Sequence, residues 1–202
     1  FDVKLIEKKI TSKTRGIFLS PVLGNPCNMD FLDYLCKKYN LELILDGCDS
    51  LGTLWNGKYL TEMAKVSSCS FYPAHHITCG EGGMISSTDE DLISMVRSFA
   101  WWGRDCYCVG SANLLACGTC GNRFDKWLEP MYDGIVDHKY IFTNMGYNLK
   151  PLDLQGALGL EQLKKFDFIE EKRRESRERV SKIFEDNLDI KVPIQLDQAD
   201  TS

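Results

Sequence analysis

The chain has 202 residues, of which 44% are hydrophobic, so it is long enough to bury a globular core. Its net charge is −5 at an isoelectric point near 5.3, and it has no long basic run, which argues against nucleic acid or an anionic membrane as its main partner. It also lacks a run of about 18 apolar residues and the basic-then-apolar order of a signal peptide. We therefore expect a cytoplasmic protein.

The patterning predicts elements in this order: a strand over 16–20, a turn over 24–26, a helix over 29–38, a strand over 41–46, strands over 68–72 and 83–86, and a helix over 89–102. The strand over 41–46 is apolar enough to be buried on both faces. Asp89 is expected near the N-cap of its helix. Strands and helices at these intervals predict an α/β fold with a largely parallel sheet flanked by helices.

The remainder of the chain divides into two stretches of different character. Residues 103–148 are rich in Gly, Cys, Asn and aromatic residues and show little periodicity. We expect this irregular stretch to be functional or to be held in place by something else. Residues 152–188 return to helical patterning. Their charged run over 164–179 is expected to be a solvated helix face.

Nine cysteines are a high and odd number for this length. A secreted disulfide framework is usually short, loop-rich and even in cysteine number. Several of these cysteines instead stand inside apolar runs, which favours a reducing compartment. Taken singly, four of them are expected to be ordinary packed or surface residues: Cys27, Cys36, Cys69 and Cys79.

The stretch from Ser67 to Gly83 reads S-S-C-S-F-Y-P-A-H-H-I-T-C-G-E-G-G. It resembles the cofactor-lysine segment of the sugar-nucleotide aminotransferases that use pyridoxal phosphate (PLP), with a pattern of S-F-x-P-x-K-x-x-T-x-G-E-G-G. His75 takes the place of the lysine. An imidazole cannot form the lasting Schiff base of an amine, yet it can still move protons. His76 is the rival base, and the register of the motif favours His75.

The resemblance implies further cofactor residues. Asp46 ends a predicted strand, where ligand crevices open in α/β sheets, and its carboxylate would pair with the pyridine nitrogen. Asp46-Gly47 can also be read as a simple turn. Ser70, five residues before His75, matches the family serine that binds the cofactor phosphate. Asn148 lies in a G-x-N-x-K segment that resembles a family motif near substrate or cofactor.

The resemblance spans residues 15–163. It implies an aspartate-aminotransferase-like fold (PLP fold type I). Residues 1–150 would be part of the large domain, with a cysteine loop over 103–124 that holds iron and sulfur. Residues 151–202 would be a long helix and the truncated start of a small C-terminal domain. The glycine-rich helix start expected upstream for the phosphate is missing, so we expect a fragment of a longer enzyme.

The cysteine spacing resembles one branch of this superfamily, the CDP-6-deoxy-4-hexulose 3-dehydrases, whose [2Fe–2S] ligands follow C-x57-C-x-C-x7-C. Cys48 and Cys106 enclose residues 49–105, and Cys108 follows after one residue. The x7 position falls on an alanine, so Cys120, within T-C-x-x-R-F, is preferred as the fourth ligand and Cys117 is the alternate. Four thiolates suit such a cluster. A structural zinc site on Cys106, Cys108, Cys117 and Cys120, or no metal, remains open.

The resemblance implies a dehydratase that removes the C3 hydroxyl of a CDP-linked 4-keto-6-deoxyhexose in deoxysugar or O-antigen lipopolysaccharide biosynthesis. Pyridoxamine 5′-phosphate (PMP) would be the working cofactor. A separate NADH-dependent flavin/iron–sulfur reductase would supply electrons, and the enzyme would be a homodimer. Two alternatives stay open. One is a cluster-free, PLP- or PMP-dependent sugar-nucleotide dehydratase or aminotransferase-like protein, and the other is an inactive, zinc-stapled scaffold.

Overall fold

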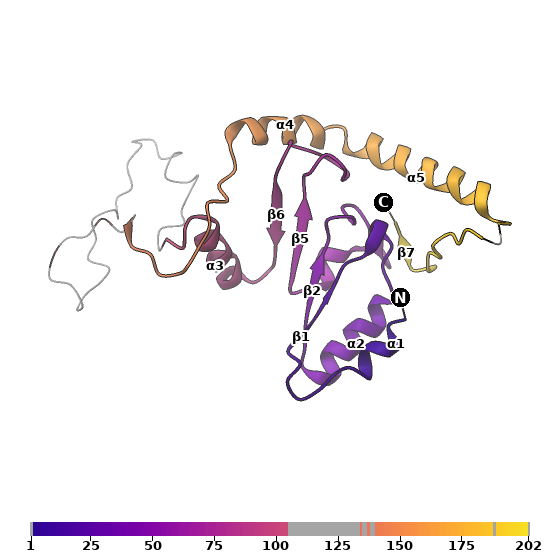
Figure 1. Cartoon of the computed structure of the whole chain (residues 1–202), viewed down its shortest axis with the longest axis horizontal. Helices are drawn as coiled ribbons and strands as arrows, with labels where there is room; N and C mark the ends of the chain where they lie inside the picture. Colours follow the sequence, from indigo (N-terminus) through magenta and orange to yellow (C-terminus); the bar gives the residue numbers. More distant parts are fainter. Residues whose placement is uncertain (1, 105–133, 135–136, 138–139, 188, 202) are drawn as a thin grey trace. The chain divides into compact units, whose positions relative to one another are not determined.

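The computed structural model describes residues 2–104, 134, 137, 140–187 and 189–201 (Figure 1). The chain forms two compact units: unit 1 consists of residues 1–88 and 151–202, and unit 2 of residues 89–150. The expected division into a large domain over 1–150 and the start of a small domain over 151–202 stays a prediction.

Unit 1 is built on a four-stranded sheet with the order β1-β2-β5-β6. The strands are β1 (Gly16–Leu19), β2 (Glu42–Asp46), β5 (Val66–Ser70) and β6 (Gly83–Ser86). The first three are parallel, and β6 runs antiparallel to β5. The segment between β5 and β6 is a short return, whereas a parallel pair needs a longer crossover. The expected α/β fold with a largely parallel sheet is confirmed.

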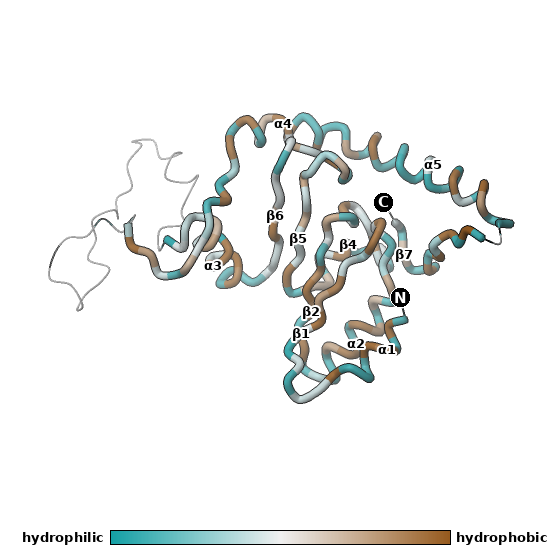
Figure 2. The backbone as a smooth tube through the Cα atoms, in the orientation of Figure 1, coloured by the Kyte–Doolittle hydropathy of each residue, from teal (hydrophilic) through white to brown (hydrophobic). Residues whose placement is uncertain are grey.

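The core lies between one face of this sheet and helix α2 (Met29–Tyr39). Side chains alternate along a strand, so β2 buries Leu43 and Leu45 on this face while Ile44 and Asp46 on the other face are half-buried. The strand is therefore covered mainly on one face within the described residues, and not on both as expected. Met29, Leu32 and Leu35 of α2 are fully buried against it, and Figure 2 shows hydrophobic and hydrophilic residues mixed along this helix.

Helix α2 begins and ends as its sequence indicates. The Asn28 side chain accepts a hydrogen bond from the N–H of Phe31 at 2.9 Å, which caps the N-terminus. Asn40 closes the helix in the left-handed conformation, with a φ of 51°. Helix α1 (Lys4–Glu7) lies beside α2, and Glu7 pairs with Lys38 at 2.9 Å (Figure 1).

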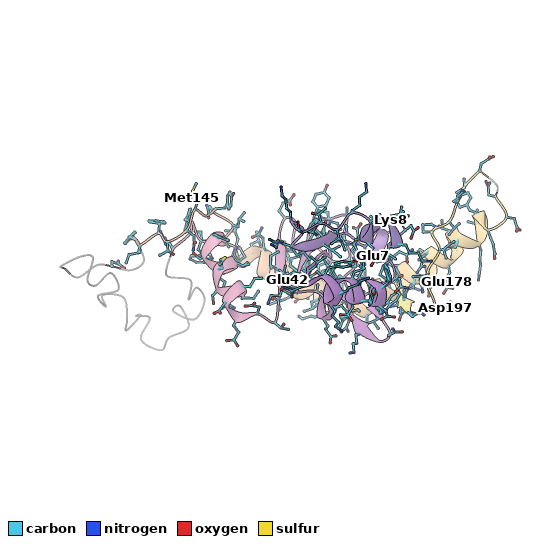
Figure 3. The ribbon with its side chains drawn as sticks, turned by 90° about the horizontal axis from the view of Figure 1, so that it is seen from below. Glu7, Lys8, Glu42, Met145, Glu178 and Asp197 are labelled. Atoms are coloured by element: carbon cyan, nitrogen blue, oxygen red, sulfur yellow. The ribbon has the colours of Figure 1, made fainter. Side chains whose placement is uncertain are left out.

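The other elements of unit 1 are short strands and turns, followed by two long helices. A small antiparallel sheet has the order β4 (Lys58–Tyr59), β3 (Leu54–Trp55), β7 (Ala199–Asp200), and the two 3₁₀ turns are η1 (Val22–Gly24) and η2 (Leu60–Met63). Helices α4 (Asp153–Leu163) and α5 (Phe166–Phe184) follow one another. Charged side chains such as Glu178 are exposed along α5, as the charged run predicted (Figure 3).

Unit 2 contains helix α3 (Glu90–Ala100) and the segment 140–150. Asp89 caps α3, because its side chain accepts a hydrogen bond from the N–H of Leu92 at 2.9 Å. Gly103 has a φ of +75°, and a Cβ there would run into the carbonyl of Asn144. Met145 is 96% exposed and projects from this segment (Figure 3). Among the described residues, no helix is long and apolar enough to cross a membrane.

Candidate active site at the carboxyl edge of the sheet

Three parallel strands end side by side in unit 1, and we call this the carboxyl edge. Asp46 is the last residue of β2 and pairs in register with Ser68 of β5. Its Oδ1 accepts hydrogen bonds from the Ser68 hydroxyl at 3.0 Å and from the N–H of Cys48 at 3.3 Å. The pKa of Asp46 is lowered, mainly by the Cys48 thiol beside it. The Ser68 hydroxyl, the Cys48 N–H and His75 lower this pKa further, whereas partial burial raises it. This carboxylate is therefore held ionised.

Gly47 lets the chain turn tightly against β5 after Asp46. Its N–H donates to the carbonyl of Ser68 at 3.0 Å, and a Cβ here would lie 2.7 Å from that same oxygen. Only glycine fits such a close approach of two backbones. The turn continues to Ser50, whose N–H donates to the carbonyl of Gly47 at 3.0 Å. Asp46-Gly47 is thus a turn as well as the place where a carboxylate is presented, and Cys48 and Asp49 follow within it.

His75 lies in the segment that follows β5. Its N–H donates to the carbonyl of Tyr72 at 3.0 Å, and the Tyr72 ring meets its ring edge-on at 6.2 Å between centroids. The His75 side chain is 21% exposed, and its Nδ1 lies 3.1 Å from Oδ1 of Asp49. His76, by contrast, is only 4% exposed. The first histidine therefore keeps a surface that a ligand can reach, whereas the second is packed inside.

Asp49 was not predicted as a site residue. It stands three residues after Asp46, on the turn from β2, and meets His75 from another turn. The only sequence signal for it is a second carboxylate in the segment D-G-C-D. A spacing within one motif cannot reveal a contact that forms between two strand ends.

Ser70 ends β5 and faces the same side of the sheet as Ser68. Its hydroxyl oxygen accepts the N–H of Tyr72 at 3.2 Å, which leaves the hydroxyl proton able to donate. The segment beyond is closed by the N–H of Phe71, which donates to the carbonyl of Gly82 at 2.9 Å, and by the Thr78 hydroxyl, which donates to the carbonyl of Phe71 at 2.9 Å. These contacts fix the short return in which His75 sits.

Of the four predicted cluster ligands, only Cys48 lies within the described residues. It is half-buried, and its Sγ is 3.7 Å from the Ser68 hydroxyl. Burial, followed by the neighbouring Asp46 carboxylate, raises the pKa of the Cys48 thiol. Cys106, Cys108 and Cys120, and the alternate Cys117, lie outside the described residues. Within the described part of the chain, no three His, Cys, Asp or Glu side chains are grouped to hold a metal.

Asn148 belongs to unit 2, where it is exposed and forms an isolated antiparallel bridge with Trp101. The carboxyl edge of unit 1 gathers the other cofactor candidates. It brings together an ionised carboxylate, a hydroxyl and an imidazole paired with a second carboxylate. These groups fit a ligand with a basic ring nitrogen and a phosphate, beside a centre where a proton is moved.

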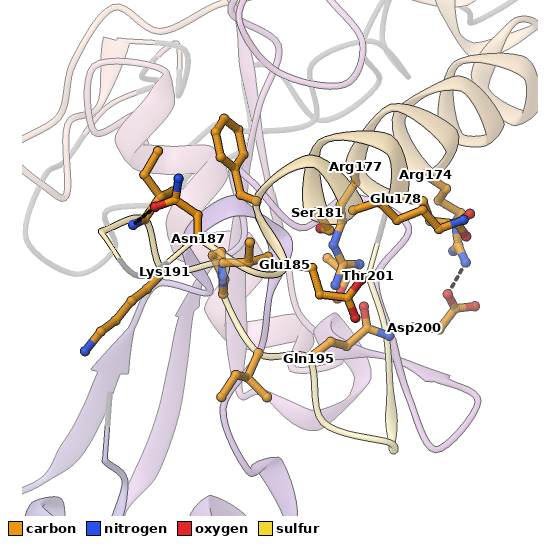
Figure 4. Close-up of a pocket in the computed structure, with 16 residues that line it drawn as sticks. Arg174, Arg177, Glu178, Ser181, Glu185, Asn187, Lys191, Gln195, Asp200 and Thr201 are labelled. Atoms are coloured by element: carbon orange, nitrogen blue, oxygen red, sulfur yellow. Dashed lines mark hydrogen bonds and ion pairs between the residues drawn. The ribbon is translucent and has the colours of Figure 1, made fainter.

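A separate hollow of about 770 Å³ lies in unit 1 between α5 and residues 190–201 (Figure 4). Arg174 on α5 reaches across it to Asp200 of β7. Its lining has both charge signs, and none of the described candidate site residues is part of it. The hollow is therefore distinct from the carboxyl edge.

The comparison with protein families identifies the chain. All of its residues, 1–202, match the DegT/DnrJ/EryC1/StrS aminotransferase family. The chain belongs to this family. The family predicted from the motif around His75 is thus confirmed, and so is the resemblance of this sequence to the sugar 3-dehydratase branch.

Two curated relatives show the level of similarity. The chain is 42% identical over 173 residues to the lipopolysaccharide biosynthesis protein RfbH of Salmonella typhimurium, covering 86% of this chain and 38% of that protein. It is 39% identical over 175 residues to the dTDP-4-dehydro-2,6-dideoxy-D-glucose 3-dehydratase of Saccharopolyspora spinosa, covering 87% and 37%. The chain therefore spans less than half the length of these relatives.

Two solved structures show the fold. The E. coli GDP-4-keto-6-deoxy-D-mannose-3-dehydratase with bound hydrated PLP matches with a TM-score of 0.73 and 25% identity, over 99% of this chain and 48% of that one. The aminotransferase PseC of Helicobacter pylori matches with a TM-score of 0.71 and 26% identity, over 93% and 43%. The predicted aspartate-aminotransferase-like fold, PLP fold type I, is confirmed.

Proposed function

We propose that this chain is the part of a sugar-nucleotide 3-dehydrase that carries its cofactor site, and that the enzyme removes the C3 hydroxyl of a CDP-linked 4-keto-6-deoxyhexose. The observation that carries the proposal is His75 at the lysine position of the family motif, near the Asp46 carboxylate and with its Nδ1 3.1 Å from Oδ1 of Asp49. Relatives named as a sugar 3-dehydratase and as a lipopolysaccharide biosynthesis protein support the reaction and its place in deoxysugar and lipopolysaccharide biosynthesis.

The cofactor is PMP, the amine form of PLP. Asp46 holds a proton on the ring nitrogen through an ionic hydrogen bond, Ser70 donates its hydroxyl to the phosphate, and Asn148 contributes a polar group near substrate or cofactor. When bound, PMP supplies an amine that condenses with a ketone and a ring that takes up electron density. The groups at the carboxyl edge fit these demands, because the Asp46 carboxylate can accept a hydrogen bond from a protonated ring nitrogen and the Ser70 hydroxyl can donate one to a phosphate.

His75 is the residue that moves the proton at C4′ of the cofactor. Its side chain is partly exposed at the carboxyl edge, and it cannot hold the cofactor covalently as a lysine would. Amino transfer to the sugar is then replaced by loss of the C3 hydroxyl. The buried position of His76 favours His75 for this role.

Replacing a C–OH by a C–H consumes two electrons and two protons and releases one water. We assign the supply of single electrons to a [2Fe–2S] cluster on Cys48, Cys106, Cys108 and Cys120, with Cys117 as the alternate fourth ligand, because thiolates in this number hold such clusters. The electrons would come from an NADH-dependent flavin/iron–sulfur reductase. We also expect the complete enzyme to be a homodimer.

A second candidate is a cluster-free dehydratase of a GDP-linked sugar. It is favoured by the solved GDP-4-keto-6-deoxy-D-mannose-3-dehydratase, which covers 99% of this chain at 25% identity. That reading accounts for His75 and leaves the spacing of Cys48, Cys106 and Cys108 without a role. Loss of the hydroxyl from CDP-, GDP- and dTDP-linked 4-keto-6-deoxyhexoses, compared side by side, separates the two.

The experiment that tests the cofactor site is the substitution His75→Lys. An amine at position 75 should form a covalent link to PLP that borohydride fixes, seen as a mass increase on the peptide containing residue 75. The unchanged chain should bind PLP without such a link, and His76→Lys should behave like the unchanged chain. A fixed link in the His76→Lys variant, but not in His75→Lys, would contradict the proposed register.

A further inference from the structure

We propose that Asp49 is a positioning residue for His75: it fixes the hydrogen on Nδ1 and so leaves Nε2 as the nitrogen that handles the proton at C4′. The inference rests on the proposed function of His75 and adds a residue to it. Its basis is the 3.1 Å contact between Nδ1 of His75 and Oδ1 of Asp49, which come from the turns after two neighbouring parallel strands.

At this separation, the chemistry of the two groups sets the direction of a hydrogen bond between them. A carboxylate oxygen only accepts, so the ring nitrogen that faces it must carry the hydrogen. The other ring nitrogen of the neutral imidazole then has a free lone pair. Carboxylates that bind the far nitrogen of a working histidine fix its tautomer and its ring orientation in this way.

Asp49 is itself held in place from the opposite side. Its Oδ2 accepts the backbone N–H of Leu23 at 3.3 Å, so its two oxygens point to two different partners. Leu23 adopts a left-handed conformation with a φ of 55°, which is unusual for a residue other than glycine, and its side chain is 66% exposed. Backbone hydrogen bonds accompany this conformation: the Leu23 N–H donates to Asp49, and the N–H groups of Gly24 and Asn25 donate to the carbonyls of Pro21 and Val22.

The contacts form a relay across the carboxyl edge. Leu23 follows β1, Asp49 follows β2 and His75 follows β5, and these strands are neighbours in the sheet. Gly24 allows the close approach, because a Cβ at its position would lie 2.7 Å from the carbonyl oxygen of Asp49. Asp46, the other carboxylate near His75, accepts at Oδ1 from Ser68 and Cys48, whereas the Asp49 carboxylate contacts the ring.

The test is the ¹⁵N NMR spectrum of the histidine side chains in the whole chain, read at alkaline pH, where the rings are neutral. The chain has three histidines, and the signal pair that disappears in His75→Asn identifies His75. In the unchanged chain its Nδ1 should carry the hydrogen and its Nε2 should be bare. The opposite tautomer would overturn the inference without any variant being needed.

Asp49→Asn should invert the tautomer. The Leu23 N–H needs an acceptor, so the amide oxygen turns to it and the NH₂ group faces Nδ1, which must then be bare. The exchange rate of the PMP C4′ hydrogen should fall by on the order of 100-fold or more, while PMP affinity stays unchanged. Asp33→Asn, on the surface of α2, is the matched control and should change neither.

The outcomes separate this inference from the proposed function. An unchanged tautomer in Asp49→Asn would overturn the positioning role and leave the function of His75 intact. If Asp49→Asn changes the tautomer of His75 but the His75→Asn variant still exchanges the C4′ hydrogen at the full rate, the proposed function is refuted instead. If Asp49→Asn does not fold, the spectrum of the unchanged chain still decides the inference.

Discussion

At the scale of single residues, an imidazole at position 75 changes how a cofactor must be held. A lysine would retain the cofactor through a covalent bond, whereas His75 leaves retention to noncovalent contacts. In our proposal the ionised Asp46 and the Ser70 hydroxyl make the contacts that retain the cofactor. The contribution of each contact to cofactor affinity should therefore be directly measurable by substitution.

Asp46→Asn should weaken PMP binding by about 10- to 100-fold, because an ionic hydrogen bond is worth about 1.5–3 kcal/mol. The measurement is a titration of PMP followed by its fluorescence. Asp33→Asn, which removes a carboxylate from an exposed ion pair on α2, should bind PMP like the unchanged chain. Equal affinities in both variants would show that Asp46 is only a turn residue.

Cys27 makes a prediction about alkaline stability. Burial raises the pKa of the Cys27 thiol to about 11, above its ordinary value of 9.0. Because the folded-state pKa lies above the unfolded one, the neutral thiol contributes stability that is complete below pH 9 and is lost as the pH rises toward 11. Urea unfolding across this range should show a falling free energy of unfolding. The fall should be smaller in Cys27→Ala, and an equal fall would contradict the assignment.

At the scale of elements, the relay across the carboxyl edge depends on the turn η1. Leu23→Gly should relieve the left-handed strain, worth about 1–2 kcal/mol, against a loss of about 0.5–1 kcal/mol for the added backbone freedom of glycine. The free energy of unfolding should therefore stay the same or rise by up to about 1.5 kcal/mol. The neighbouring Val22 is also exposed but has no positive φ, so Val22→Gly relieves no strain and should lower the free energy of unfolding. Greater destabilisation by Leu23→Gly would refute this account of the turn.

Much of unit 1 could be predicted because its elements are long enough to show a period. Helix α2 was expected over 29–38 and spans Met29–Tyr39, and β2 was expected over 41–46 and spans Glu42–Asp46. The two-residue strands β3, β4 and β7 are too short for any period. The break between α4 and α5 was missed because the residues around it, such as Lys164 and Lys165, are ordinary helix formers.

The candidate site could be predicted only where one motif holds its members in sequence. His75 and Ser70 stand in one segment, and Asp46 ends a strand whose apolar run is plain. Asp49 was not predicted as a site residue, because its contact with His75 forms only when the ends of β2 and β5 lie side by side. Its contact with the backbone N–H of Leu23 on η1 could not be predicted either, because every residue except proline has such an N–H and the sequence does not show where it donates.

At the scale of the whole molecule, the chain matches its family over all of its residues and spans 37–38% of the length of the two curated relatives compared above. The electron supply, the reductase and the homodimer are therefore proposals for the complete enzyme. Among them the cluster is the most readily tested, because its predicted ligands lie within this chain.

Protein prepared without air from iron-supplied cells should hold two irons and two sulfides per chain and absorb visible light, as a [2Fe–2S] centre does. Cys48→Ser should lose the iron and keep C4′ exchange. Iron retained in Cys117→Ser and lost in Cys120→Ser would support Cys120 as the fourth ligand, and the reverse would assign Cys117. One zinc with no iron would refute the cluster and leave the cluster-free dehydratase or the zinc-stapled scaffold.

The central claim is that His75 moves the proton at C4′ in a site that has no lysine. Its most direct test is the exchange of the C4′ hydrogen of PMP with deuterated water, followed by mass spectrometry in three proteins. The unchanged chain and His76→Asn should exchange at similar rates, and His75→Asn should bind PMP but exchange at no more than the rate of free PMP. Normal exchange in His75→Asn, with exchange abolished in His76→Asn, would contradict the account.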